Sequence, residues 1–582
     1  MDFRLPQQDP ALAARRDGLA ARQKEYAFTS FNDLPIGETF HDRDKPGPLW
    51  VRELLALIHQ SRENLEAYLA VAGEAFVSPL PQRSLAELAS ALAHKDFTTL
   101  LNHYLPELGC MVSGGRARSI EEYRRVFQKE PLPKIADVFM EDWVFARSFV
   151  AGANPTLLRR LDAPLASFPV SDEQFRGGRE FHDDSLTRAI GEGRVFVVDY
   201  AHLALLRSGV HPQRPKYVGQ PRVMLAVPRG GKSLVAIAIG AGPDATAPIW
   251  TPVDGWAWQL AKQAVRVADG CHQELLTHLG FTHLVIEAFV VATRRCLAES
   301  HPLYALLDPH FEGTMPINAL AVKKLIQPGE AVDRLLGADV PSIYALLKQE
   351  RLAFGFGAHY VPVDFAARGV DDAERLADYP YRDDAQKIWR AIHRWVSGYV
   401  DHYYASDEGI VADHELQAWA RELANPTQGA IRDLGKDGQI RDVATLKDVL
   451  AMIIFTASAQ HAAANFSQKT EMAFAPAHPL SGYAPMPLAG AVVSERDFFD
   501  ALPPLDVAVR TEQTMIFLGS LRYGELGHYG RFHFKSPAII DRMRQFQSEL
   551  EEIESAIVDR NRTQILPYIH LQPTRIPQSI NI

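Results

Sequence analysis

The C-terminus is the most restrictive feature of this sequence, because the chain ends on IPQSINI, with Ile580 and Ile582 as apolar residues. Chain ends are usually polar and exposed to solvent. An apolar end that folds into the interior also buries its α-carboxylate, which is costly unless the carboxylate is paired or binds a metal. We therefore expect a cation in the core beside Ile582.

Composition and charge restrict the class of protein. Of the 582 residues, 47% are apolar and 23% are charged, as is typical of a globular chain. A net charge of -10 without a basic stripe argues against a nucleic-acid partner. Cys110, Cys271 and Cys296 form no CxxC pair, so neither a disulfide framework nor a cysteine zinc site is expected.

The sequence also bears on the compartment. Its first residues lack the pattern of a signal peptide, and we expect no stretch of about 20 apolar residues that could span a bilayer. A small number of unpaired cysteines fits a reducing environment. We therefore expect a cytoplasmic protein, and peripheral contact with membranes is left open.

Helical periodicity dominates the chain. Apolar residues recur at helical spacing in 48–76 and again in 85–104, and helices are expected to return from about residue 256 onward. Between these regions lie three short β-rich runs bounded by Gly and Pro, at 194–200, 222–228 and 233–240. The expected fold is mainly α, with one large helical domain that carries a small β-sheet.

Histidines are dense between residues 271 and 311, where His278 and His283 stand five positions apart. In a regular α-helix this spacing turns two side chains about 140° away from each other. A π-bulge, whose hydrogen bonds run from i to i+5, would bring both to one face. His272 and His278 are six positions apart, which does not fit the helix motif of zinc proteases.

A second polar pair lies in HAAANFSQ, where His461 and Asn465 stand at i, i+4 and share a helix face. A single helical histidine is more often structural than a ligand, and for His278 with His283 both interpretations stay open. The buried carboxylate favours the ligand interpretation. Three imidazoles, an amide oxygen and a carboxylate suit a redox-active non-haem iron better than calcium, magnesium or structural zinc.

With these segments the sequence resembles the lipoxygenase family over roughly residues 135–582. The matching blocks, in chain order, are EDWVFARSFVAGANP (141–155), GRVFVVDYAHL (193–203), WQLAKQAVRVAD (258–269), HLGFTHLVIEAFVVATRR, HPLYALLDPHF, TMPINALA (314–321), HAAANFSQ and PYIHLQPTRIPQSINI. The resemblance implies a lipoxygenase-type helical catalytic domain with long central iron-binding helices.

The resemblance also implies a set of metal ligands at matching positions, namely His278, His283, His461, Asn465 and the carboxylate of Ile582. The expected metal is iron that cycles between Fe2+ and Fe3+, with manganese as the alternative, and an iron-bound hydroxide would be the catalytic group. Glu274 and Gln468 match a polar pair that links the iron helix to the asparagine-bearing helix, with an ordinary buried hydrogen bond as the alternative.

Two departures from the family pattern affect this interpretation. Gln273 stands where relatives commonly carry a histidine, so His272 is left out of the site. Residues 1–130 show helical periodicity and are expected to form a helical elaboration without the family's N-terminal lipid-binding β-barrel. The catalytic domain is expected at 131–582. This is the pattern of a compact, bacterial-type lipoxygenase.

The resemblance extends to residues of the substrate pocket. Ala321 falls where the family carries alanine or glycine, and alanine usually accompanies S products because its methyl group shields the oxygen path. The alternative is a small residue selected for packing. Leu284, next to His283, is expected to wall the cleft. Leu335 and Leu336 stand where relatives vary pocket depth and suggest a shallower pocket.

The activity implied is insertion of O2 into polyunsaturated fatty acids such as linoleate and arachidonate. Removal of a bis-allylic hydrogen would precede oxygen addition, and the product would be an S-configured hydroperoxide. The alternatives are a hydroperoxide isomerase with the same ligands, a non-catalytic fatty-acid-binding protein and, least favoured, a zinc hydrolase. The expected partners are the fatty acid and O2, and a monomer is favoured.

Overall fold

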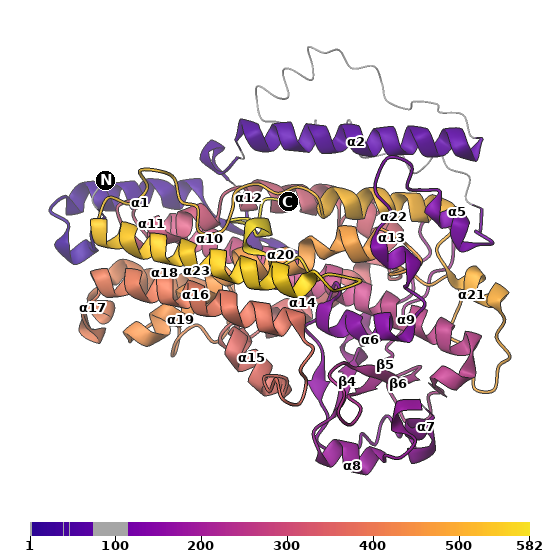
Figure 1. Cartoon of the computed structure of the whole chain (residues 1–582). Helices are drawn as coiled ribbons and strands as arrows, with labels where there is room; N and C mark the ends of the chain where they lie inside the picture. The colour runs from indigo at the N-terminus through magenta and orange to yellow at the C-terminus, as the bar shows by residue number, and fades with distance from the viewer. Residues whose placement is uncertain (1–2, 39, 46, 74–114, 178) are drawn as a thin grey trace.

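The computed structural model describes residues 3–38, 40–45, 47–73, 115–177 and 179–582. Figure 1 shows a helical body with a small sheet at one end and helix α2 running along the opposite side. The mainly α class predicted from the sequence is confirmed. The helix predicted at 85–104 lies outside the described residues.

The five-stranded sheet is an antiparallel meander in the order β3-β4-β5-β6-β7. Its strands are β3 (Arg159–Arg160), β4 (Val195–Asp199), β5 (Arg222–Ala226), β6 (Val235–Gly240) and β7 (Ile249–Trp250). The three β-rich runs predicted from the sequence correspond to β4, β5 and β6. Because successive side chains point to opposite faces, Phe196 and Leu225 join the main core, while Val197 and Met224 join a second cluster.

Two long helical runs cross the interior. The first spans Trp256–Cys296 and consists of α9 (Trp256–His272), a π-helix (Gln273–His283) and α10 (Leu284–Cys296). The second spans Val443–Met472 and consists of α19 (Val443–Phe455), a π-helix (Thr456–Gln460), α20 (His461–Asn465) and a further π-helix (Gln468–Met472). All residues predicted to ligate the metal, except the C-terminus, lie on these two runs.

These two runs correct the expectation that the chain has no apolar stretch of membrane-spanning length. By length and composition both could cross a bilayer, with mean hydropathies of 1.7 and 1.3 in their most apolar windows. However, 89% and 67% of those windows are buried inside the protein. Their apolar character is therefore explained by their position in the core, where the free thiols of Cys271 and Cys296 are also buried.

The remaining helices surround the two central runs. In chain order the longer ones are α1 (Leu12–Glu25), α2 (Pro48–Ala72), α6 (Asp142–Ala151), α12 (Thr314–Lys324), α14 (Val340–Ala353), α15 (Val361–Arg368), α16 (Pro380–Tyr403), α18 (His414–Ala424), α22 (Leu505–Leu518) and α23 (Pro537–Asn561). Shorter ones include α5 (Ile120–Arg124), α7 (Asp172–Arg176), α8 (Leu186–Gly191), α11 (Pro302–Leu307), α13 (Ala331–Leu335), α17 (Asp407–Ala412) and α21 (Glu495–Ala501).

The described residues of the N-terminal part contain a β-hairpin in addition to α1 and α2. Strand β1 (Phe28–Phe31) pairs with β2 (Leu34–Gly37) in antiparallel register. Helix α2 begins at Pro48 and ends at Ala72, and it is followed by Gly73, whose φ of 73° is left-handed and suits glycine. Trp50 and Leu54 on α2 are buried and so dock this helix onto the body.

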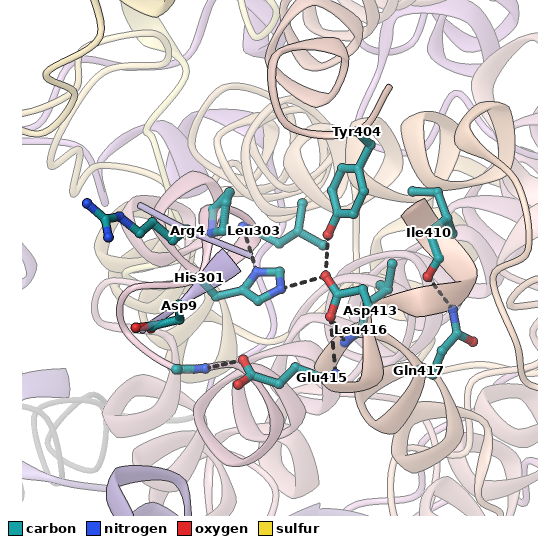
Figure 2. A network of polar contacts seen from close by, with 12 residues as sticks. Arg4, Asp9, His301, Leu303, Tyr404, Ile410, Asp413, Glu415, Leu416 and Gln417 are labelled. Atoms are coloured by element: carbon teal, nitrogen blue, oxygen red, sulfur yellow. Dashed lines mark hydrogen bonds and ion pairs between the residues drawn. The ribbon is translucent and has the colours of Figure 1, made fainter. Parts of the chain in front are cut away.

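A buried polar network, whose part around His301, Asp413 and Glu415 is shown in Figure 2, fastens α1 to the helical body. His301 Nε2 lies 2.9 Å from Asp413 Oδ2, and the Tyr404 hydroxyl donates to the same oxygen over 2.6 Å. Glu415, two residues further on, accepts from Arg15 of α1 with an Nε–Oε1 distance of 2.5 Å. Each charged group in this network has a partner, as buried charges require.

Candidate metal centre

His278 and His283 lie in the π-helix Gln273–His283. The wider π turn brings residues five positions apart onto one face. The Nε2 atom of His278 lies 3.2 Å from the Nε2 atom of His283. The π geometry inferred from the spacing is therefore present, and the two imidazoles point toward one position.

The third histidine comes from the other central run. His461 opens α20, and its Nε2 atom lies 3.2 Å from that of His283. Among the described histidines, cysteines and acidic residues, His278, His283 and His461 form a group whose ligand atoms all lie within 4.8 Å of one another. Their exposed fractions are 6%, 5% and 1%. Two helical runs that are far apart in sequence thus build one compact cluster.

Burial keeps these imidazoles neutral. It lowers the pKa of His278 to about 4 and the pKa of His283 to about 3, and it places the pKa of His461 well below the ordinary value. His283 donates its Nδ1 proton to Asn318 Oδ1 over 2.7 Å, so its Nε2 carries a lone pair. Lone pairs that face one another at 3.2 Å repel unless a cation lies between them. The donor set therefore fits a transition metal.

The C-terminus reaches this cluster. Ile582 is 5% exposed, and its backbone oxygen lies close enough to His461 to oppose the fall in the pKa of that imidazole. Trp50 Nε1 donates to Asn581 O over 2.7 Å, and Thr314 Oγ1 donates to Ile580 O over 3.0 Å. These bonds hold the terminal segment in the interior, so its carboxylate is available to a metal held by the histidines.

Asn465 lies one helical turn after His461 and is completely buried. Its Nδ2 group donates to Leu518 O over 2.8 Å. Its Oδ1 atom is 3.5 Å from Gln468 Nε2. Because the amide nitrogen is already engaged, Oδ1 is the atom that could serve as a weak ligand.

The polar pair predicted beside the ligands converges on His278. Gln468 Nε2 lies 3.1 Å from His278 Nδ1, and Glu274 Oε2 lies 3.7 Å from the same atom. Gln468 Oε1 has no hydrogen-bond partner among the described residues. If the side-chain amide is flipped so that its oxygen and nitrogen exchange places, Oε1 accepts the Nδ1 proton of His278. The Nε2 atom of His278 is then left for a metal. Burial raises the pKa of Glu274 to about 8.

Gln273, which departs from the family pattern, makes a further direct link between the two runs. Its Nε2 group donates to Ala464 O over 2.8 Å. His272 contacts a different residue, because its Nδ1 atom lies 2.7 Å from His202 Nε2. Sequence reasoning missed the role of Gln273 in joining the runs, and the only signal was its position five residues before His278.

Asn318 is a second residue that the sequence analysis did not place in the site. It lies on α12, is 2% exposed, and accepts the Nδ1 proton of His283. Its Nδ2 group donates to His283 O over 3.0 Å. A polar residue three positions before Ala321, between Ile317 and Ala319, was the available signal.

A cavity of about 630 Å³ opens beside the cluster. His278, His283 and Ile582 form part of its wall. Most of the remaining wall is apolar and includes Leu54, Leu275, Leu279, Ile317, Leu320, Leu325, Ile326, Phe517 and Leu518. The charged residues on its wall are Glu274, Lys324, Glu330, Arg334 and Arg510. A cavity of this size and polarity suits a long apolar ligand with a small polar end.

The structure separates the predicted pocket residues into two groups. Ala321 is 7% exposed and lines the cavity. Leu284, Leu335 and Leu336 are also buried, but they are not among the residues that line this cavity. Helix α2 contributes Trp50, Leu54 and Ser61, which sequence reasoning did not assign to the pocket.

Comparison with known proteins decides the family. The lipoxygenase family model matches residues 33–568. The chain is 40% identical over 495 residues to linoleate 9/13-lipoxygenase of Pseudomonas aeruginosa, with 81% of this chain and 71% of that protein aligned. The chain belongs to the lipoxygenase family. As a member of a family of dioxygenases, this lipoxygenase is an oxidoreductase.

Two further relatives bear on the chemistry. The lipoxygenase is 31% identical over 453 residues to hydroperoxide isomerase ALOXE3 of Homo sapiens, with 77% of this chain and 63% of that protein aligned. Its structure matches a lipoxygenase variant crystallised anaerobically in complex with arachidonate, with a TM-score of 0.86 and 26% identity. That match covers 100% of this chain and 84% of the other. Members of the family generally use non-haem iron and act on polyunsaturated fatty acids with O2.

Proposed function

We propose that this lipoxygenase is a non-haem iron dioxygenase that converts linoleate and arachidonate to S-configured hydroperoxides. The proposal rests mainly on three neutral, buried imidazoles whose Nε2 atoms converge beside an apolar cavity of about 630 Å³. His278, His283 and His461 would hold the metal, with Asn465 and the Ile582 carboxylate completing the set. Iron bound there supplies the one-electron oxidation that removal of a bis-allylic hydrogen requires.

The residues of the chain itself bind the acid and exclude water. The apolar wall of the cavity, including Leu275, Ile317 and Phe517, can bury the methylene groups of the substrate. Each buried methylene contributes roughly 0.8 kcal/mol. His278 and His283 lie on the same wall, so a substrate in the cavity would place its reactive carbon beside the cluster. This positioning lowers the entropic part of the barrier.

The test uses purified protein of known iron content, supplied with linoleate or arachidonate in air. We expect conjugated dienes, detected by absorbance, and one dominant S hydroperoxide, resolved by chiral chromatography. An iron-loaded protein that forms no dienes from either acid would contradict the proposal.

The S configuration rests on Ala321, whose methyl group lies on the cavity wall. We expect Ala321→Gly to open space for oxygen on the other face of the substrate and to increase the fraction of R product several-fold. Chiral chromatography of the products measures this change. Iron content should stay at the wild-type level, because Ala321 is not proposed as a ligand. An unchanged product ratio would mean that Ala321 serves packing alone.

We also propose pocket roles for three leucines. Leu284, Leu335 and Leu336 would act from behind the residues that line the cavity, by supporting its wall and limiting its depth. Leu335→Ala would then shift the oxygenated carbon, and product analysis by mass spectrometry would detect the shift. Metal analysis of the native protein decides between iron and manganese, and a finding of manganese would put that metal in the place of iron in this proposal.

A second candidate is a hydroperoxide isomerase. It is favoured by the 31% identity to a relative with that name. An isomerase would share every ligand, so the products decide between the two. Consumption of a fatty-acid hydroperoxide by a protein that leaves linoleate unchanged would support the isomerase.

The organisation of the chain completes the proposal. Residues 131–582 would form the catalytic domain, and residues 1–130 would be an N-terminal elaboration that supplies Trp50, Leu54 and Ser61 to the cavity. The described part of this elaboration contains the β1–β2 hairpin besides its helices. We further propose a cytoplasmic monomer. Vesicle co-sedimentation would test peripheral membrane contact, and light scattering would test the oligomeric state.

A further inference from the structure

A chain of short hydrogen bonds leads from the N-terminal hairpin to a metal-facing histidine. The Gly37 N–H at the end of β2 donates to Glu287 Oε1 over 2.6 Å. The other oxygen of Glu287 accepts from Asn318 Nδ2 over 2.5 Å. Asn318 Oδ1 in turn accepts the Nδ1 proton of His283 over 2.7 Å. Three bonds therefore connect a backbone amide outside the central helices to the imidazole.

The Glu287 carboxylate is buried, and both of its oxygens accept hydrogen bonds. Glu287 lies on α10, one turn after His283, and is 5% exposed. Both of its oxygens face donors, Gly37 N–H and Asn318 Nδ2, so each has to act as an acceptor. An ionised carboxylate meets this requirement with both oxygens, whereas a protonated one would direct a hydrogen at a donor. Burial raises the pKa of Glu287, while the hydrogen bonds from Asn318 and Gly37 and the charge of Arg351, which is 3% exposed, oppose that rise.

The carboxylate also acts on the amide between it and the histidine. When Glu287 accepts from Asn318 Nδ2, it orients the amide so that Oδ1 faces His283. An acceptor at Nδ1 fixes the tautomer and ring orientation of a ligating histidine and increases its basicity. Without the carboxylate, the Asn318 Nδ2 group would keep His283 O as its acceptor but would lose the shorter bond, so the amide would be held less firmly with Oδ1 toward Nδ1.

We propose that Glu287 is a positioning residue for His283 and that the N-terminal hairpin, through the Gly37 amide, holds this carboxylate in place. The inference rests on the proposed iron site. It makes the hairpin part of the metal centre, although the hairpin contributes no ligand. A substitution in the hairpin should therefore weaken iron retention even in a protein that still folds.

The surroundings of Gly37 support this role. A Cβ atom at this position would overlap Met315 Cε and would lie 3.1 Å from Glu287 Oε1. Only glycine lets the amide approach the carboxylate this closely without displacing its neighbours. In contrast, a Cβ atom at Gly18 on α1 would meet nothing within 4 Å. The two glycines thus offer a matched pair of substitutions in the same part of the chain.

The first experiment compares Glu287→Gln with Glu415→Gln. Both changes remove a buried carboxylate that accepts from a backbone N–H, since Glu415 Oε2 accepts from Ala298 N over 3.0 Å. The readouts are the rate of iron loss to a chelator and the electron paramagnetic resonance spectrum of the ferric protein. We expect Glu287→Gln to weaken iron retention by about 10- to 100-fold and to alter the spectrum. Glu415→Gln should lose thermal stability but keep the wild-type spectrum and iron retention.

The second experiment changes a residue of the hairpin and leaves Glu287, Asn318 and His283 themselves unchanged. Gly37→Ala should push the amide away from Glu287, speed the loss of iron and alter the ferric spectrum, while Gly18→Ala leaves both unchanged. The inference is overturned if Gly37→Ala folds with wild-type spectrum and iron retention, or if Glu287→Gln and Glu415→Gln affect iron equally. If the wild-type protein binds no iron, the proposed function fails instead, and the two failures are thus distinguished.

Discussion

Two groups of buried histidines in this molecule have opposite environments. In the network of Figure 2, His301 Nδ1 accepts the Leu303 N–H over 3.0 Å, and its Nε2 faces Asp413 Oδ2 at 2.9 Å. In the metal centre, Nε2 of His283 faces Nε2 of both His278 and His461. His301 is completely buried and the other three nearly so, so burial alone does not tell a ligand from a structural residue.

The difference lies in the partners of the ring nitrogens. Both nitrogens of His301 are satisfied by protein groups, so nothing further is needed to stabilise it. The three clustered imidazoles instead direct their Nε2 atoms at one another, and His283 Nε2 lies 3.2 Å from each of the other two. The arrangement becomes favourable only when a cation occupies that position. A convergence of ring nitrogens without protein partners therefore marks a candidate metal site better than histidine density does.

The largest contrast is expected when the same substitution is made in both groups. His461→Gln should reduce iron affinity by more than about 100-fold, because it removes a proposed ligand and not merely an outer hydrogen-bond partner. His301→Gln should keep its iron and its activity, since the glutamine amide can still donate to Asp413. Metal analysis after dialysis and the rate of diene formation measure both effects. Equal loss of iron in the two variants would remove the distinction.

A C-terminal extension tests the terminal carboxylate without altering any side chain. One glycine appended after Ile582 should displace the carboxylate from the cluster and abolish iron retention. The thermal unfolding temperature of the metal-free protein should change little, because Trp50 and Thr314 still hold the preceding residues. Full activity and normal iron content in the extended protein would contradict the assignment of Ile582 as a ligand.

The contribution of the His301–Asp413 network to the stability of the fold should depend on pH. Burial alone would raise the pKa of Asp413, but attraction and hydrogen bonds from His301, with bonds from Tyr404 and a backbone amide, lower it to about 2 from 3.8. A lowered carboxyl pKa stabilises the fold above pH 3.8, and this contribution is lost as the pH falls through about 2.

The measurement is the free energy of unfolding at several pH values between about 2 and 5, for wild type and for Asp413→Asn. The wild-type value should fall more steeply over this range, by up to roughly 2 kcal/mol in total. Iron content at neutral pH should be the same in both proteins. Parallel pH profiles would mean that Asp413 contributes no stabilising charge.

Several parts of the site could be predicted from the residues. The spacing of His278 and His283 predicted a π-helical turn, and the structure has one at Gln273–His283. The apolar ending predicted a buried terminus, and Ile580 and Ile582 are buried. Local spacing was sufficient here, because helical geometry relates positions within a few residues.

Other features depended on segments that are distant in sequence. Gln273 reaches Ala464 on the second run, and Gly37 in the hairpin reaches Glu287 on the first. Nothing in the local pattern of either residue indicates its partner. The three leucines assigned to the pocket by family position do not line the cavity, whereas residues of α2 do.

By itself, the sequence determined which residues can share a helix face, which chain end is buried, and which family the ordered blocks resemble. Only the tertiary structure decided which imidazole nitrogens meet, which histidine is hydrogen-bonded to Asp413, and which amide supports Glu287. The physical reason is the distance in sequence over which each kind of information acts. Periodicity reports the face of a single element, while hydrogen bonds between elements depend on how those elements pack, and packing is decided by the whole core.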